Sequence, residues 1–196
     1  MALEPLDLRR SALVVWDMQD AIAGRAFNRT EIVPRVAALL AAYRARGLPV
    51  VYSQHTTLPE GWGNPAMVRA AARRGMAPGS FRLTPGAPEW EILPELAPRA
   101  DELVLPKTTP SFFVGTPIEE LLRFRACETI VLTGVSTEGG ILGTARHAVT
   151  LGFHPLVVED AVGSSSPEGH AEGLRVLRAM SDVETTATVL ARLGPG

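Results

Sequence analysis

Residues 129–152 read TIVLTGVSTEGGILGTARHAVTLG, and this stretch indicates the fold class of the chain. Thr129–Thr133 is an apolar run rich in Val, Ile and Leu, as expected for a strand that is covered on both faces. A turn containing glycine follows, and a helical pattern over Glu138–Leu151 continues until Gly152 stops it. A strand that leads through one tight turn into a helix is the repeating unit of parallel α/β sheets.

The same alternation continues on both sides of this stretch. Further apolar runs predict strands at Ala12–Trp16, Pro49–Ser53, Glu102–Pro106, Pro155–Glu159 and Val183–Thr185. Helical patterns separate most of these runs, at 30–47 with Thr30 as the expected N-cap, at Pro117–Arg125 and at Pro167–Met180. We therefore expect a three-layer α/β fold with one doubly wound, mostly parallel sheet of about six strands. Ligands bind such sheets beyond the carboxyl ends of the strands, so polar residues that follow strands are the candidates for a site.

The length and composition favour a single domain over residues 1–196. A stretch at about 58–90, rich in Pro and Gly with a short helical pattern over Ala66–Arg74, is expected to be a lid or a substrate loop. The formal net charge of −2 gives no basic surface for nucleic acid, and no apolar run reaches the ~20 residues of a membrane span. The charged, proline-containing N-terminus does not resemble a signal peptide, so we expect a cytoplasmic protein without a nucleic-acid or membrane partner.

Three polar positions follow predicted strands. Asp17 ends the first strand and is a candidate general acid or base because it is partly desolvated there, although Asp also favours turns and helix caps. Lys107 follows the third strand and can hold a carboxylate, although most lysines are solvated surface residues. The turn at 134–140 opens a helix whose free N–H groups can bind an anion, although such turns often only connect a strand to a helix.

Taken together, these segments resemble the isochorismatase-like hydrolase family, also called the cysteine hydrolases. That family has an Asp in a D-x-Q motif after the first strand, a Lys after the third, and a T-G-x-x-T/A-x-x-C-V turn that opens a helix. Here residues 17–19 (Asp-Met-Gln) match the first motif, Lys107 the second and residues 133–141 the third, while Lys107–Phe113 is similar to the family's K-x-R-Y-S-A-F stretch. The resemblance implies the strand order 3-2-1-4-5-6, a small-molecule substrate and a homodimer or homotetramer.

The register of this resemblance places the family's nucleophilic cysteine on Gly140. A glycine cannot form the covalent acyl-enzyme that the family's amidases use. The single cysteine, Cys127, precedes the fourth strand at the amino end of the sheet, which points away from the site, so we expect it to be inert. The isochorismatases themselves carry a glycine at this position and hydrolyse a vinyl ether without a nucleophilic side chain.

The resemblance therefore implies a hydrolase that acts on a small carboxylated molecule by Asp/Lys acid–base chemistry, without a covalent cysteine intermediate. In the vinyl-ether scheme Asp17 protonates the alkene carbon and water adds to the oxocarbenium, while Lys107 adjusts the proton affinity of Asp17 and binds the negative charge of the substrate. With that strand order the two residues begin roughly 10 Å apart. The loop after Lys107 is therefore expected to curl inward for the pair to meet.

Glu138 leaves alternatives open. It is a third candidate catalytic residue because its carboxylate can act as a base toward water, and it also suits the first turn of a helix through the helix dipole. If Asp17 and Glu138 handle water directly, the protein is a hydrolase or lyase acting on another small ring substrate. If the chemistry was lost with the cysteine, the protein is a catalytically silent pseudoenzyme whose pocket serves ligand binding.

The remaining candidates lie around the pocket in the register of the family. The predicted substrate-binding residues are Gln19, Gln54, His55, Phe113, Val135, Ser136, Gly139 and Gly140. The family's nicotinamidases bind a metal through D-x-H after the second strand, where this chain has His55 followed by two threonines. One histidine does not make a site for a divalent metal, so we expect neither a metal nor a cofactor.

Overall fold

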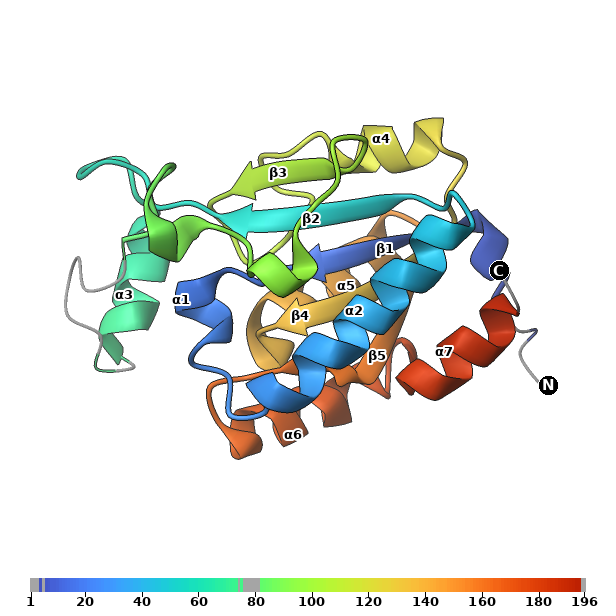
Figure 1. Ribbon diagram of the computed structural model, residues 1–196. Coiled ribbons are helices and arrows are strands. Elements are labelled where there is room, and N and C mark those ends of the chain that lie inside the picture. Colours follow the sequence, from blue (N-terminus) through green and yellow to red (C-terminus); the bar gives the residue numbers. More distant parts are fainter. Residues whose placement is uncertain (1–3, 5, 74, 76–81, 195–196) are drawn as a thin grey trace.

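The computed structural model describes residue 4, residues 6–73, residue 75 and residues 82–194. Six parallel strands form one sheet in the order β3-β2-β1-β4-β5-β6, with helices on both faces (Figure 1). The strands are β1 (Ser11–Trp16), β2 (Val50–His55), β3 (Leu103–Lys107), β4 (Thr129–Val135), β5 (His154–Gly163) and β6 (Asp182–Glu184). The predicted doubly wound α/β fold and its strand order are confirmed.

Seven α-helices and four short helical turns connect the strands within the described part of the chain. The α-helices are α1 (Asp20–Ala23), α2 (Arg29–Ala45), α3 (Pro65–Arg73), α4 (Ile118–Phe124), α5 (Leu142–Thr150), α6 (Pro167–Leu177) and α7 (Thr186–Leu193). The 3-10 turns are η1 (Leu8–Arg10), η2 (Pro88–Trp90) and η3 (Pro94–Leu96), and η4 (Thr137–Ile141) is a π-helical turn. None of the described helices is long and apolar enough to cross a membrane.

The side chains of β1 alternate between two apolar layers, as the pleat of a strand requires. Helices α2 and α7 cover the face that carries Leu13 and Val15, and helices α4, α5 and α6 cover the face that carries Val14 and Trp16 (Figure 1). Every residue of β1 is buried, as expected for a central strand. The alternation therefore directs the side chain of Trp16, the last residue of β1, toward the α5 side of the sheet.

One polar contact fastens α2 to β1 within the first of these layers. The hydroxyls of Tyr43 and Ser11 share a buried hydrogen bond of 2.7 Å, and the Ser11 hydroxyl also donates to the Leu8 carbonyl at 2.6 Å. Burial raises the pKa of Tyr43, so the phenol remains protonated. We expect Tyr43→Phe to lower the free energy of unfolding by about 1 kcal/mol in urea denaturation, because Ser11 keeps its bond to Leu8.

Ser11→Ala is the informative partner of this variant. It leaves the Tyr43 hydroxyl buried without its partner and should therefore destabilise the protein more than Tyr43→Phe does. A larger loss for Tyr43→Phe would contradict this account of the contact.

Strand β3 departs from the burial expected of it. Leu103 and Pro106 are exposed, and Lys107 is the one fully buried residue of the strand. The prediction of cover on both faces was wrong for this strand because β3 is the edge of the sheet. Beside it a cavity of about 410 Å³ separates β2 and β3 from α4.

Several boundaries differ from those predicted because tertiary contacts decide them. Helix α2 begins at Arg29 rather than after Thr30, and Asn28 ahead of it donates from Nδ2 to the Val162 carbonyl at 3.1 Å, which fastens the helix to β5. Strand β5 continues to Gly163, beyond the predicted end at residue 159, because its pairing with β4 contains a bulge. The short helices α1 and α7 were not predicted.

The long stretch at 58–90 contains helix α3, which lies beyond the carboxyl ends of the strands (Figure 1). None of the residues of α3 is buried. Residues 74 and 76–81, including Arg74 of the predicted helix, lie outside the described residues. The role of this stretch as a lid stays a prediction.

Candidate active site

Asp17 and Lys107 form a buried ion pair beyond the carboxyl end of β1. Lys107 Nζ donates to Asp17 Oδ2 at 2.6 Å, and the side chains of Lys107 and Asp17 are only 2% and 7% exposed. The hydroxyl of Ser53, on β2, donates to the other carboxylate oxygen at 2.6 Å. Both oxygens of Asp17 are therefore engaged by donors from neighbouring strands. Ser53 was not predicted, although it is a polar residue in the buried part of an apolar strand.

The register of the sheet explains how the pair meets across β2. Trp16 pairs with Ser53, and Ser53 pairs with Leu105, so Lys107 lies two residues further along the direction of the strands. Lys107 is the last residue of β3, and its long side chain spans the intervening strand. The following loop turns inward as expected, since Phe112 packs on Trp16 and donates to Thr144 of α5. Lys107 precedes that loop, however, so its own side chain provides the reach to Asp17.

Asp17 adopts a left-handed backbone conformation with φ = 44°. A non-glycine residue in this region costs about 1–3 kcal/mol and persists only where the surroundings fix it. Here the Asp17 N–H donates to both the carbonyl and the hydroxyl of Ser53, at 3.2 Å and 3.1 Å. β2 therefore holds both the backbone and the carboxylate of Asp17 in place.

The indole of Trp16 lies against the ion pair, and Trp16 was not among the predicted site residues. Lys107 Nζ lies 4.1 Å from the ring centroid, and Phe112 packs edge-on against the indole with its centroid 5.8 Å away. A desolvated cation on an aromatic face is stabilised by up to about 2 kcal/mol. The signal was present in the sequence, since a tryptophan directly before Asp17 ends an otherwise aliphatic strand.

Among the residues of the predicted anion-binding turn, Gly140 adjoins this group. It is buried against the indole, and a Cβ built on it would lie 2.0 Å from Trp16 Nε1. Gly139 instead faces the hydroxyl of Ser136, 2.5 Å from where its Cβ would be. The side chain of Val135 is buried in the layer under α2. The structure thus brings Gly140 to the indole that carries Lys107 and places Val135 in the core.

Glu138 belongs to a different group of side chains, packed against α6. A Cβ on Gly169 of that helix would lie 3.3 Å from Glu138 Cδ, and the Oε2 atom of Glu138 is buried without a hydrogen-bond partner among the described residues. The adjacent Thr137 hydroxyl shares a hydrogen bond of 2.9 Å with His170 Nδ1. Within the described chain no hydrogen bond or ion pair joins Glu138 to the central pair, so its catalytic role stays a prediction.

Gln19 and Gln54 hold the end of the long loop against the strands. The Gln19 amide accepts from the His55 N–H at 2.7 Å and donates to the carbonyls of His55 and Trp90 at 3.0 Å and 2.8 Å. Gln54 Nε2 donates to the same Trp90 carbonyl at 2.9 Å. Both glutamine side chains are buried. Their amide groups thus fix Trp90 in place, and their predicted role as substrate contacts stays a prediction.

His55 ends β2 beside the ion pair and is half-buried. Burial lowers the pKa of His55, the Lys107 ammonium lowers it further, and the Asp17 carboxylate offsets part of this effect. The imidazole is therefore neutral at pH 7, which suits the predicted role of a hydrogen-bonding group for substrate.

This shift gives His55 a defined effect on stability. The pKa of His55 is lower in the folded than in the unfolded protein, where it is about 6.5, so the unfolded state binds more protons as the pH falls below that value. Stability should fall between pH 7 and pH 5, and His55→Gln should reduce this fall in urea denaturation. His154→Gln, at an exposed histidine, is the control, and an equal reduction by both variants would refute the assignment.

Phe113 packs away from the ion pair. Its ring stacks on Phe153 at 5.8 Å and contacts His147 at 5.3 Å between centroids. The preceding residue, Phe112, is the aromatic that reaches Trp16. The structure thus gives Phe113 a packing role, and its predicted substrate contact stays a prediction.

Cys127 lies at the other end of β4 from the site. It precedes the strand, is buried, and its Sγ lies 3.9 Å from the Arg125 carbonyl. Burial raises the pKa of this thiol, so the reactive thiolate is disfavoured. Its position accords with the inert role expected for it.

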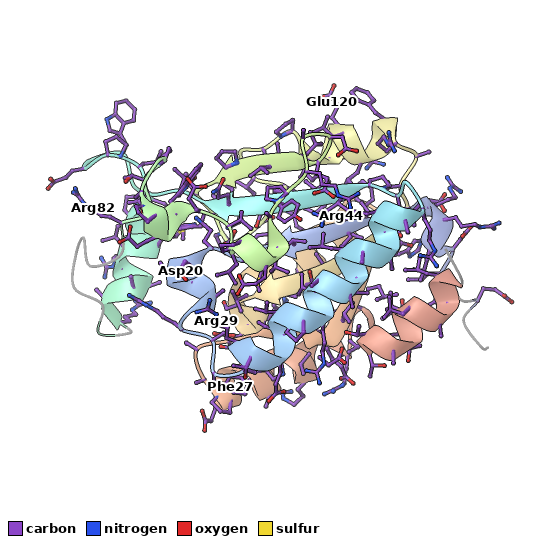
Figure 2. All side chains as sticks on the ribbon, viewed as in Figure 1. Asp20, Phe27, Arg29, Arg44, Arg82 and Glu120 are labelled. Carbon is purple, nitrogen blue, oxygen red and sulfur yellow. The ribbon has the colours of Figure 1, made fainter. Side chains whose placement is uncertain are left out.

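A cavity of about 480 Å³ opens between the end of β2 and the long loop. Its lining residues are Thr56, Thr57, Leu58, Pro59, Glu60, Arg82, Thr84 and Pro85. Figure 2 shows Arg82 at the end of the molecule toward which the strands point. The N–H of Thr56 donates to the Lys107 carbonyl at 2.8 Å, so one residue of the cavity wall is bonded to the backbone at the end of β3. The described residues contain no group of three or more His, Cys, Asp or Glu side chains placed to hold a metal.

Fold and site together define a doubly wound α/β protein with an Asp–Lys pair at the carboxyl ends of its strands. Residues 11–188 match the isochorismatase domain model. The chain is 34% identical over 168 residues to the isochorismatase family protein YecD of Escherichia coli O157:H7, covering 84% of this chain and 86% of that protein. It is 30% identical over 203 residues to ureidoacrylate amidohydrolase RutB of Methylorubrum extorquens, covering 93% and 80%.

A solved cysteine hydrolase from Pseudomonas syringae pv. phaseolicola has the same fold, with a TM-score of 0.84 at 24% identity over 97% of this chain and 95% of that one. The chain belongs to the isochorismatase family and is a hydrolase of that family.

Proposed function

We propose that this hydrolase acts on a small carboxylated molecule by proton transfer at Asp17 and Lys107, without a covalent intermediate on the protein. The observation that carries the proposal is the buried 2.6 Å ion pair, whose ammonium lies on the same indole that adjoins Gly140, a position without a side chain. In the register of the family, Gly140 stands where the amidases have their nucleophilic cysteine. The thiol of Cys127 lies at the opposite end of β4 and does not replace it.

Asp17 is the acid in this scheme. A substrate carboxylate that binds the Lys107 ammonium takes the counter-ion from Asp17, so the Asp17 carboxyl binds a proton more readily. Protonated Asp17 then gives that proton to the alkene carbon of a vinyl ether. Water adds to the oxocarbenium carbon and returns a proton to Asp17, and the resulting hemiketal opens to a carbonyl and an alcohol. Lys107 stabilises the carboxylate that Asp17 becomes when it gives up its proton.

The composition of the chain supports a chemical role for Lys107. It is the only lysine among the nineteen basic residues, all the others being arginine. A guanidinium is a large planar group, whereas an ammonium is a compact charge. The residue that pairs with Asp17 is thus the one position where the chain uses lysine.

A substrate screen tests the proposal. Purified protein is assayed with carboxylated vinyl ethers, amides such as the ureido compounds that name the RutB relative, and small ring substrates. We expect turnover of a vinyl ether that persists after iodoacetamide treatment and is lost in Asp17→Asn. Amide turnover that iodoacetamide abolishes would overturn the non-covalent scheme. Ring turnover lost in Glu138→Gln would favour the alternative with Asp17 and Glu138, and no turnover would favour a pseudoenzyme.

We also propose that the protein is a cytoplasmic homodimer or homotetramer, in line with the resemblance described above. Light scattering on the purified protein measures the assembly directly, and a monomer at micromolar concentration would contradict this part of the proposal.

A further inference from the structure

The indole of Trp16 occupies the space into which a side chain on residue 140 would project. A Cβ on Gly140 would lie 2.0, 2.2 and 2.4 Å from Nε1, Cε2 and Cζ2 of Trp16, far inside the 3.0 Å that real Cβ contacts keep. The indole is not free to move aside, because it is 1% exposed and Phe112 packs on it. Any residue other than glycine at position 140 must therefore displace this ring.

The same ring carries the cation of the site. Lys107 Nζ lies 4.1 Å from the centroid of the Trp16 ring and 2.6 Å from Asp17 Oδ2. Trp16 thus touches both Gly140 and Lys107. If the indole were removed, a side chain on residue 140 would enter the space beside the ammonium.

We propose that Trp16 is the positioning residue that keeps this site free of a nucleophile, by filling the place of a side chain on residue 140 and supporting the Lys107 ammonium on its face. The non-covalent character of the site is then set by residues 16 and 140 together. A single change at Gly140 cannot install a nucleophile there. The inference rests on the proposed function for its chemical meaning, but its test requires no substrate.

Thermal unfolding tests the steric part. Trp16→Leu removes the three indole atoms named above and keeps the branch at Cγ. We expect Gly140→Cys alone to lower Tm by about 5 °C through overpacking. In the double variant Trp16→Leu/Gly140→Cys, the fall in Tm should be clearly smaller than the sum of the falls in the two single variants. Tm changes that simply add would overturn the proposal.

Gly143→Ala is the matched steric control. Its Cβ would lie 2.6 Å from the Pro110 carbonyl oxygen, with no indole involved. The variant should therefore lose stability, and Trp16→Leu should not restore it. If Gly140→Cys does not fold, the double variant is compared with Trp16→Leu, and a double variant that also fails to fold overturns the proposal.

Thiol reactivity tests whether the place filled by the indole adjoins the Lys107 ammonium. All variants in this test also carry Cys127→Ala, so that the thiol at residue 140 is the only one. In the double variant the new thiol lies beside the Lys107 ammonium, which lowers its pKa below the usual ~8.5. We expect alkylation by iodoacetamide at pH 7 to be at least about 10-fold faster than in Gly140→Cys alone. Adding Lys107→Met should move the midpoint of the pH profile upward. A single variant that reacts as fast, with the same pH profile, would overturn the proposal.

These measurements separate the two proposals. An active Asp17→Asn enzyme would contradict the proton-transfer scheme without affecting the coupling between residues 16 and 140. Tm changes that add in the double variant, together with equal alkylation rates in Gly140→Cys and the double variant, would contradict the coupling without affecting the proton-transfer scheme.

Discussion

Asp17→Asn is expected to lower kcat/KM at least about 100-fold on any substrate found in the screen, the lower end of what general acid–base catalysis contributes. The amide keeps the shape of the carboxylate and still accepts a hydrogen bond from Ser53, but it neither donates nor receives the reacting proton. The loss should lie in kcat, because the Lys107 ammonium remains to bind the substrate carboxylate. Steady-state kinetics on protein shown by circular dichroism to be folded measures it.

Asp20→Asn provides the matched control. Asp20 is three residues further along the chain, its side chain is 60% exposed, and its partner is Arg29 at 3.8 Å. Figure 2 labels both residues. The Asp20→Asn variant removes one negative charge from the same turn and should leave kcat/KM within about 2-fold of the unmodified protein, since exposed ion pairs contribute little. Equal losses for the two variants would show that the charge of the turn matters and not the proton of Asp17.

Lys107→Met is expected to destabilise the protein by about 3–5 kcal/mol, because it leaves the Asp17 carboxylate buried without its counter-ion. For a chain of this length, the corresponding fall in Tm is on the order of 10 °C. The double variant Asp17→Asn/Lys107→Met removes both charges and should regain most of this stability while remaining inactive. Thermal unfolding of the four proteins gives the coupling between the residues, and a double variant no more stable than Lys107→Met would contradict the prediction.

Lys107→Arg separates the charge of residue 107 from its size. It keeps a cation next to Asp17, but the planar guanidinium is larger than the ammonium that lies against both Asp17 and the indole of Trp16. We expect activity to fall nearly as far as in Lys107→Met while the Tm loss is smaller. Full activity in Lys107→Arg would mean that any cation at this position serves the reaction.

The sequence was sufficient for the parallel sheet because its strands carry their own signal. The runs around Leu13, Val131 and Leu156 are apolar on both faces, and each is followed by a helical pattern. The edge strand β3 has the same composition but is exposed at Leu103, since strand position in a sheet depends on which segments pair and not on composition alone. The N-terminus of α2 was likewise set by the contact of Asn28 with Val162 and not by the capping preference of Thr30.

The site was predictable in part for similar reasons. Asp17 and Lys107 follow strands and match family motifs, so their position at the carboxyl ends was foreseeable. Their contact was expected, but the way in which they meet was not, because the reach of the Lys107 side chain across β2 depends on register. Trp16 was missed because a large apolar residue at the end of a buried strand looks like ordinary core until its distance to Gly140 is known. Gln19 matches its motif and yet serves the backbone of the neighbouring strand.

The carbonyl of Trp90 accepts amide N–H groups from both Gln19 and Gln54. These bonds separate the loop between His55 and Trp90 from the strands that carry the ion pair. The chain that leaves β2 after His55 is fastened again at Trp90, so its intervening length is a closed loop with fixed ends. Doubling the length of such a loop costs only about 0.6 kcal/mol in closure entropy. New residues can therefore be inserted or exchanged there without moving Asp17 or Lys107, so the length of this loop can change while the ion pair in the sheet keeps its geometry.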